Sequence, residues 1–346
     1  MARYRRLLGA ALLAGALLAG TLTGCSADHG PGLDAALALD DCVLESATDS
    51  RPRPLLSRSV PAVFDVEVTA SEECTVDQLI ATATTVAQAA TEALDGVPAG
   101  LASSGFTQRI DDDVFAIADV HADPRAVVAA LEGWDALRRD VDGTVAVRTF
   151  HGDSVIEVGL AAGSTDTATG VLGRFVAAGS AISQGVPEWT VGRPAGGGLP
   201  ASEVVVHGER PAEELLRLAE DIEAAFTGAA SMQLGATVLS FSVLDGAGGA
   251  GRALTDSAAW PSILGTMTAM TDRGSGYGIG GVVDAEAADG SGRVVDDFAA
   301  ASTDCVAPPG GGATTRAAFD HLATVIRPAH PGQSFPQAGL SAPACR

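Results

Sequence analysis

The alternation of hydrophobic and polar side chains is clearest just after residue 60. Phe64, Val66 and Val68 alternate with polar neighbours, a pattern that predicts a strand with one buried face over 63–69. From residue 75 to 94 the apolar positions recur at helical spacing and form one stripe. Thr75 and Gln78 stand three residues apart at its start, the spacing of a capping box. A strand followed by an amphipathic helix is therefore predicted here.

The same kind of pattern continues to residue 150. It predicts strands at 106–112 and 114–121, a helix at 124–137 and a strand at 143–150. Asp123 is the expected cap of that helix, and Pro124 occupies its first position, where proline is favoured. The order β-α-β-β-α-β is that of a ferredoxin-like unit.

A second run of elements follows in the same order. Strands are expected at 155–160, 188–193, 202–208 and 236–244, with helices at 164–182 and 210–226. Val66-Glu67-Val68 is echoed by Ile156-Glu157-Val158. We therefore predict an α+β protein with tandem ferredoxin-like (βαββαβ) units and antiparallel sheets, at 63–151 and 153–245. A single α+β domain without true repeats is the alternative.

The regions outside these units are less regular. Residues 25–62 are expected to be a tether, with a short helix at most in "LDAALALDDCVLES". The glycine-rich stretch 245–252 separates the second unit from a smaller C-terminal α+β segment at 252–346. In that segment we expect helices at 256–271 and 314–327, and between them strands at 277–286 and 293–298.

The first 25 residues carry a targeting signal. Arg3, Arg5 and Arg6 precede an apolar stretch at 7–22 that is too short for an ordinary membrane-spanning helix. Leu22-Thr23-Gly24-Cys25 then follows, and this segment resembles a bacterial lipoprotein precursor with its lipobox. The resemblance covers residues 1–25 alone. It implies cleavage after Gly24, lipidation of the Cys25 thiol, and a mature protein anchored outside the cytoplasmic membrane. An ordinary secretory signal with a nearby cysteine is the alternative.

Composition narrows the classes of partner. The net charge is −22, and removal of the signal would take away three arginines and make it more negative. An acidic surface repels nucleic acid and anionic lipid headgroups, so we expect no nucleic-acid partner. Such a surface suits cations, basic peptides or simple solubility. All basic residues apart from histidine are arginine, and the chain contains neither lysine nor asparagine, which indicates a GC-rich genome and excludes Schiff-base chemistry on lysine.

Four cysteines remain besides Cys25. They are Cys42, Cys74, Cys305 and Cys345, and an even number in an exported chain predicts two disulfides. Pairing by proximity gives Cys42–Cys74 and Cys305–Cys345, although three connectivities are possible. No cysteine or histidine spacing supports a metal site, and we expect no cofactor.

The candidates for chemistry are two histidines. His121 and His207 stand where a strand meets the next helix in each predicted unit, and acidic residues follow them at Asp123 and Glu209. They are candidate ligands or proton-transfer groups, because imidazole titrates near neutral pH. The simpler interpretation is that both lie at strand ends for local structural reasons.

Aspartates are concentrated at two further places. The run 111–113 could offer oxygen ligands to Ca²⁺, but three successive aspartates between strands are better explained by a hairpin turn. The stretch 284–297 lacks the earlier ligands of a calcium loop. There is no G-x-S-x-G motif to support a serine hydrolase of that type.

Three hypotheses fit these observations. The favoured one is a non-enzymatic lipoprotein of the cell envelope that binds, senses or assembles with an unknown partner, such as an envelope protein. The others are an envelope hydrolase that uses acidic residues and a histidine, and a surface protein that binds divalent cations. No catalytic residue is assigned.

Overall fold

The computed structural model describes residues 30–52, 61–121, 124–150, 153–178, 188–196, 198–245, 252–273, 275–286, 292–301, 311–329, 340–341 and 344–345. The chain divides into two compact units, Met1–Asp135 with Arg148–Gly152 and Ala136–Val147 with Asp153–Arg346. Each unit is an α+β structure with its own helices and strands.

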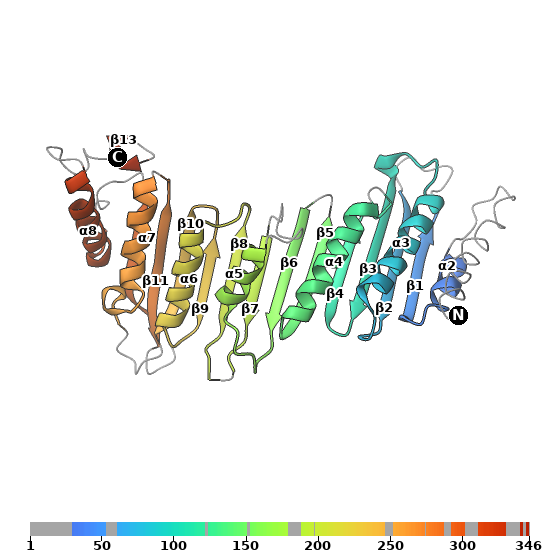
Figure 1. Ribbon diagram of the computed structural model, residues 1–346, viewed down its shortest axis with the longest axis horizontal. Coiled ribbons are helices and arrows are strands. Elements are labelled where there is room, and N and C mark those ends of the chain that lie inside the picture. The colour runs from blue at the N-terminus through green and yellow to red at the C-terminus, as the bar shows by residue number, and fades with distance from the viewer. Residues whose placement is uncertain are drawn as a thin grey trace, which may run out of the picture. The chain divides into compact units, whose positions relative to one another are not determined.

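The first unit contains four strands in chain order, shown in blue and cyan in Figure 1. Its elements are α2 (Gly30–Leu37), β1 (Val43–Arg51), β2 (Ala62–Ala70), α3 (Val76–Ala93), a short 3-10 turn at Ala99–Leu101, β3 (Ala102–Ile110) and β4 (Asp113–Ala118). β1 pairs antiparallel with β2, β2 pairs parallel with β3, and β3 pairs antiparallel with β4. The sheet is therefore mixed.

Local sequence signals explain these elements. Thr75 caps α3, where its hydroxyl accepts from the backbone N–H of Gln78 and the Gln78 side chain accepts from the backbone N–H of Thr75. The predicted capping box is thus confirmed. Asp111 and Asp112 form the turn between β3 and β4, which confirms a hairpin at the aspartate run. The core of the unit includes Phe115, whose ring centroid lies 5.8 Å from that of Trp134.

Two elements are divided between the units. Helix α4 (Pro124–Asp140) begins at the predicted proline, and strand β5 (Gly143–Phe150) follows it. Proline fits the first turn of a helix because its missing N–H would have no partner there.

The second unit continues with strand pairs and helices in turn. Its elements are β6 (Asp153–Leu160), α5 (Ala168–Ala178), β7 (Glu188–Arg193), β8 (Ser202–His207), α6 (Glu213–Ala225), β9 (Ala230–Leu234), β10 (Val238–Asp245), a 3-10 turn at Leu254–Asp256, α7 (Trp260–Arg273), β11 (Gly278–Glu286), β12 (Gly292–Ala301) and α8 (Ala313–Ala329). A short hairpin of β13 (Leu340–Ser341) and β14 (Ala344–Cys345) follows. Strands β6 to β12 lie in chain order.

Pairing in the second unit alternates between parallel and antiparallel. The pairs β6–β7, β8–β9 and β10–β11 are parallel, whereas β7–β8, β9–β10 and β11–β12 are antiparallel. The expected antiparallel sheets are therefore only partly present. The tandem ferredoxin-like arrangement is not confirmed, because a split βαβ needs a strand between the two that a helix joins, and β6 and β7 pair directly.

The repeating element order is a strand pair followed by a helix. In the described residues, the pairs that begin at Ala102, Gly143, Glu188, Ala230 and Gly278 start 41 to 48 residues apart, and each is followed by a helix. The predicted β-α-β-β-α-β unit begins instead at β2, the second strand of the pair β1–β2, and ends at β5, the first strand of a later pair. Strands joined by a short loop pair antiparallel, whereas strands joined through a crossover helix pair parallel.

The segment expected to be a tether is partly folded. Within residues 25–62, α2 and β1 are regular elements, and Asp34 of α2 accepts a hydrogen bond from Thr48 of β1 at 2.7 Å. Helix α2 overlaps the stretch in which a short helix is expected, whereas the tether prediction is wrong for β1. The prediction failed because β1 (VLESATDSR) has no clear apolar alternation. This segment is held in the strand conformation by its pairing with β2.

Helices cover one face of each unit's sheet. In Figure 1, α5, α6 and α7 lie in front of strands β7 to β11, and α3 lies in front of β2 and β3. Side chains that point toward the helices are buried, such as Trp189 and Val191 on β7. Their neighbours along the strand point to the other side. We call that other side of β7 to β11, in the second unit, the open face.

Candidate functional site

His121 is held by a buried serine of the first unit. It follows β4, and its Nδ1 lies 2.6 Å from the Oγ of Ser104 on β3. The backbone N–H of His121 donates to the same oxygen at 3.3 Å. A hydroxyl next to an imidazole is the geometry of a nucleophile and its base. Ser104 is only 2% exposed, however, so the contact fixes the loop after β4 to β3 rather than presenting a nucleophile to a substrate.

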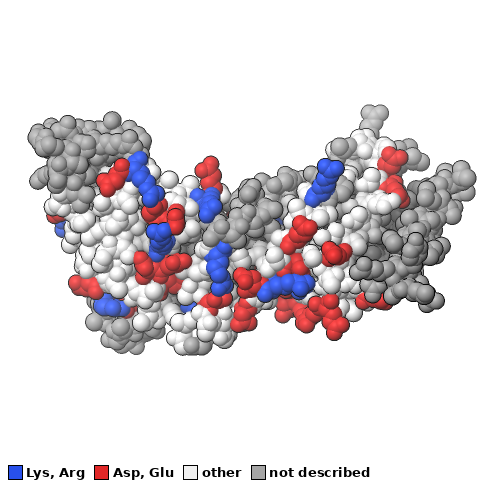
Figure 2. Space-filling model, in the orientation of Figure 1, with Lys and Arg blue, Asp and Glu red and all other residues white. Residues whose placement is uncertain are grey.

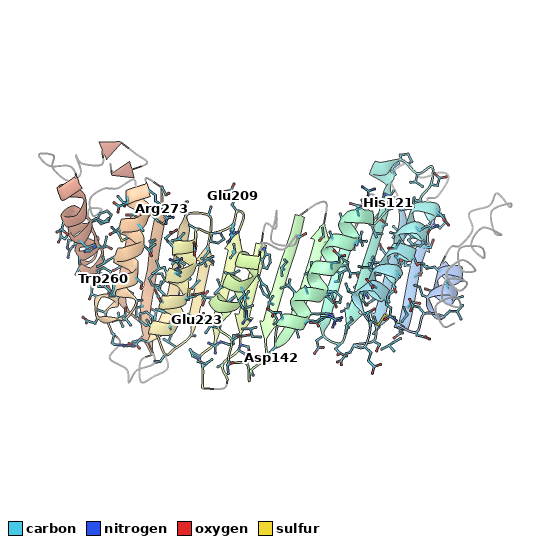
Figure 3. The ribbon with its side chains drawn as sticks, viewed as in Figure 1. His121, Asp142, Glu209, Glu223, Trp260 and Arg273 are labelled. Atoms are coloured by element: carbon cyan, nitrogen blue, oxygen red, sulfur yellow. A yellow bond between two sulfur atoms is a disulfide. The ribbon has the colours of Figure 1, made fainter. Side chains whose placement is uncertain are left out.

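The acidic residue nearest to His207 in the structure's ion pairs is Glu188, on the neighbouring strand. His207 ends β8, and its Nδ1 lies 3.5 Å from Oε2 of Glu188, the residue opposite on β7. Both side chains are about half exposed and belong to the open face. Glu209 is exposed in the loop beyond β8, at the edge of the unit (Figure 3). Asp123, the candidate that follows His121 and the expected cap of the next helix, lies outside the described residues.

One of the two predicted disulfides is confirmed. Cys42 and Cys74 are bonded, with Cα atoms 5.5 Å apart and both residues buried. The bond joins the start of β1 to the turn before α3. Cys305 and Cys25 lie outside the described residues, and only the backbone of Cys345, in β14, is described. The Cys305–Cys345 bond and the lipidation of Cys25 remain predictions.

The second unit contains a buried ionic cluster that the sequence patterns did not predict. Glu223 of α6 points to the start of α5, where its Oε1 accepts from the backbone N–H of Ala168 at 3.2 Å and its Oε2 from that of Thr169 at 3.0 Å. The Thr169 hydroxyl donates to Oε2 at 2.5 Å. Glu223 thus caps a neighbouring helix, where a negative charge is favoured by the helix dipole. Figure 3 labels Glu223 on α6.

Arg193 of β7 completes this cluster. Its Nη2 lies 3.7 Å from Oε1 of Glu223, and the two side chains are 2% and 3% exposed. Its Nε and Nη1, and the Oγ of Ser202 opposite it on β8, have no hydrogen-bond partner among the described residues. The sequence does hold a signal, since Arg193 continues the buried alternation of Trp189 and Val191 and a buried arginine needs a buried acid. The cluster holds α5, α6 and β7 together.

Asp65 is a carboxylate of the first unit whose pKa is raised. Asp65 of β2 stands opposite Asp49 of β1, and a Cβ placed on Gly105 of β3 would lie 2.7 Å from its Oδ1. Burial raises the pKa of Asp65, and the charge of Asp49 raises it further, while Arg51 and the Gly105 backbone N–H oppose the shift. Like charges on directly opposite positions of a sheet are unfavourable, so this pair costs stability at neutral pH.

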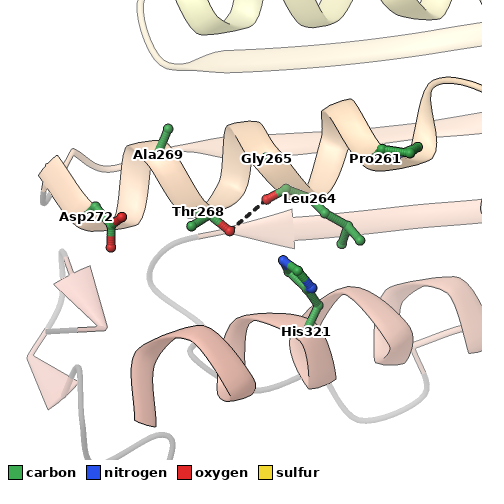
Figure 4. A pocket seen from close by; sticks show the side chains of 7 residues that line it. All are labelled: Pro261, Leu264, Gly265, Thr268, Ala269, Asp272 and His321. Atoms are coloured by element: carbon green, nitrogen blue, oxygen red, sulfur yellow. Dashed lines mark hydrogen bonds between the residues drawn. The ribbon is translucent and has the colours of Figure 1, made fainter. Parts of the chain in front are cut away.

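Helices α7 and α8 form a surface groove (Figure 4). It has a volume of about 500 Å³ and is lined mainly by α7, from Pro261 to Asp272, with His321 of α8 on the other side. The Thr268 hydroxyl is already bonded to the carbonyl of Leu264 at 2.8 Å. Trp260, the first residue of α7, packs edge-on against Phe298 and is not among the lining residues. The groove is apolar and open, with a single aspartate and a single histidine.

Neither a metal centre nor a membrane span is found in the described part of the chain. No group of three or more His, Cys, Asp or Glu side chains in those residues could hold a metal ion. No helix among them is long and apolar enough to cross a bilayer. In comparisons with known proteins, no family model, no curated protein and no solved structure matches this chain.

Proposed function

We propose that this chain is a lipoprotein of the bacterial cell envelope, anchored through Cys25 to the outer side of the cytoplasmic membrane. The observation that carries the proposal is the Leu22-Thr23-Gly24-Cys25 sequence directly after a basic and apolar signal. The buried Cys42–Cys74 disulfide supports it, since such bonds persist mainly outside the cytoplasm. Two acyl chains give stable anchoring, whereas one is marginal.

The folded part would then lie close to the membrane. Helix α2 begins at Gly30, five residues after Cys25. An extended chain spans at most about 3.5 Å per residue, so these five residues reach no further than about 18 Å. The first unit is therefore held near the lipid surface, and it carries no long tether.

We further propose that the folded part is a non-enzymatic binding or assembly module. The side chains most capable of chemistry have structural tasks: Ser104 fixes the loop that contains His121, and Glu223 caps α5 while facing Arg193. In contrast, the second unit presents a broad sheet face with exposed polar side chains. A rigid, exposed face supported by a helix layer suits recognition of a partner better than turnover of a substrate.

The anchor is tested by detergent-phase partitioning in a bacterial host that matures lipoproteins, with radiolabelled palmitate in the medium. We expect the natural chain to carry label and to enter the detergent phase. Cys25→Ala should abolish both, because the thiol is the attachment point. The matched control replaces Cys305 and Cys345 by alanine and should keep label and partitioning. A natural chain that stays unlabelled and aqueous, or a labelled Cys25→Ala variant, contradicts the proposal.

A further inference from the structure

The open face of the second unit forms two rows of small and polar side chains. The strand pairings align Thr190, Val205, Gln233, Ser240 and Gly280 in one row. They align Gly192, Glu203, Ser231, Ser242 and Val282 in the next row. Glu203, Ser231, Gln233, Ser240 and Ser242 are exposed. The face is therefore wide, made mostly of small side chains, and rich in hydrogen-bonding groups.

Two features of this face leave room for another chain. Purely parallel sheets are usually covered on both faces, whereas in this mixed sheet the parallel pairs β8–β9 and β10–β11 have helices on one side. In addition, a Cβ added to Gly192 would meet no atom within 4 Å. Glycine within a strand weakens it, and it is often found where another backbone approaches closely. The helix-free side is therefore accessible, and the missing side chain of Gly192 leaves room for another chain close to the backbone.

The charges of the open face have one sign. Glu203 is exposed on β8, Asp284 is half-buried on β11, and Glu188 faces His207. No arginine is found among the described side chains of this face. Arg193, the arginine of β7, is buried on the helix side. The helix-covered side shows arginines and acidic residues intermixed (Figure 2). Opposite faces of the same unit therefore differ in charge.

The negative charge of the open face favours one class of binding partner over the others. A second copy of the same face would bring like charges together, and an anionic lipid surface would be repelled for the same reason. A cationic chain would be attracted, and its guanidinium and backbone groups would find acceptors on the serine, threonine and glutamine side chains. The small side chains leave room for such a chain to lie close to the sheet.

We propose that the open face of β7 to β11 is a docking surface for a basic polypeptide segment of an envelope partner. Glu203 and Asp284 supply the attraction, and the row that contains Thr190, Gln233 and Ser240 supplies hydrogen bonds. This inference rests on the proposed binding role but not on the lipid anchor. A negative result in the lipid-anchor test therefore does not contradict the docking proposal, and a negative result in the peptide-binding test does not contradict the anchor.

The experiment measures binding of a fluorescent octa-arginine peptide to the full chain purified in detergent. Fluorescence anisotropy at low and physiological salt gives the Kd, and a glycine-serine peptide of equal length is the uncharged control. The double variant Glu203→Gln with Asp284→Asn should raise the Kd about fivefold, as expected for two partly exposed charges. The matched control Glu209→Gln with Asp221→Asn removes two charges elsewhere and should change the Kd by less than about twofold.

A third variant separates docking from general attraction. Ser240→Trp changes no charge but places a bulky ring on the open face, so it should also raise the Kd about fivefold. If it does not fold, as judged by circular dichroism, the equally uncharged Ser231→Tyr takes its place with the same expectation. Equal loss of binding in the open-face and control double variants would overturn the proposal, and so would unchanged binding in the bulky variant.

Discussion

Arg193 and Glu223 face each other inside the second unit, with Nη2 and Oε1 3.7 Å apart and both side chains almost fully buried. Glu223 also accepts from two backbone N–H groups and a hydroxyl at the start of α5. Removing one partner of a buried pair leaves an uncompensated charge, which typically costs about 3–5 kcal/mol. Through these contacts, β7, α6 and the start of α5 are held together.

The first prediction concerns this pair. Glu223→Gln should lower the free energy of unfolding by about 3 kcal/mol, measured by urea denaturation followed by circular dichroism. Combining it with Arg193→Met should restore part of that stability, because no buried charge is then left. A double variant less stable than Glu223→Gln by the full cost of a second independent loss would show that the two side chains are not coupled.

The second prediction is a pH dependence of the first unit. The pKa of Asp65 is raised by burial and by Asp49, so the folded state holds this proton more tightly than the unfolded chain does. The resulting stability is present below the unfolded pKa of Asp65 and is lost as the pH rises through its raised folded value. Asp65→Asn should therefore raise the unfolding free energy at about pH 7 and give no gain near pH 3. An equal effect at both pH values would contradict this assignment.

The third prediction concerns a carboxylate whose pKa is lowered rather than raised. Arg174 bonds both carboxylate oxygens of Asp166, at 3.1 and 2.9 Å, and this lowers the pKa of Asp166. Its stabilisation is present above the unfolded pKa and is lost as the pH falls through the lowered folded value. Because the two side chains are 48% and 31% exposed and solvent screens the pair, Asp166→Asn should cost only about 0.5 kcal/mol at neutral pH and almost nothing near pH 2, measured by urea titration. A loss that persists in acid would point to a non-ionic role.

The fourth prediction compares two glycines of the second unit. A Cβ on Gly281 would overlap the ring and the carbonyl oxygen of Phe241, whereas one on Gly192 meets open space. Gly281→Ala should therefore cost about 1–3 kcal/mol, as overpacking does. Gly192→Ala should stabilise by about 0.5 kcal/mol, because it restricts the unfolded chain. Thermal unfolding of both variants checks this, and a Gly281→Ala variant as stable as the natural chain would be at odds with so close an approach of Phe241.

The fifth prediction concerns the disulfide. Cys42 and Cys74 close a loop with a sequence separation of 32 residues. In the chain-entropy account, a loop of this size is worth about 3–4 kcal/mol. Replacing both cysteines by alanine should lower the unfolding free energy by that amount, and alkylation of the natural chain without reductant should label neither thiol. Ready labelling of the non-reduced protein would refute the bond.

Much of the local structure could be predicted from sequence. The alternation around Phe64 located β2, the Thr75 and Gln78 pair located the start of α3, and Pro124 located the start of α4. These signals depend on neighbouring residues and therefore do not need tertiary context.

The topology could not be predicted in the same way. The order of elements fits both a split βαβ unit and a repeated strand pair with a helix, and the two differ only in which strands become neighbours. Strand β9 was missed because its five residues, ASMQL, include no β-branched side chain and are held by β8 and β10. β1 was missed for a similar reason, since pairing decides its state.

The candidate site was the least predictable part. Glu209 is the acidic residue near His207 in sequence, whereas the sheet register brings Glu188 opposite it. Glu223 and the start of α5 are more than fifty residues apart, so only the packing of α6 on α5 reveals the cap. The open face is also a property of register, since its rows combine residues from five strands.

Lipid anchoring through Cys25 is decided by the mass of the N-terminal peptide of the mature protein, recovered from membranes of a lipoprotein-processing host. We expect a peptide that begins at Cys25 and carries a diacylglycerol thioether on its sulfur. A mature protein that begins at another residue, or that begins at Cys25 with an unmodified thiol, would rule the anchor out.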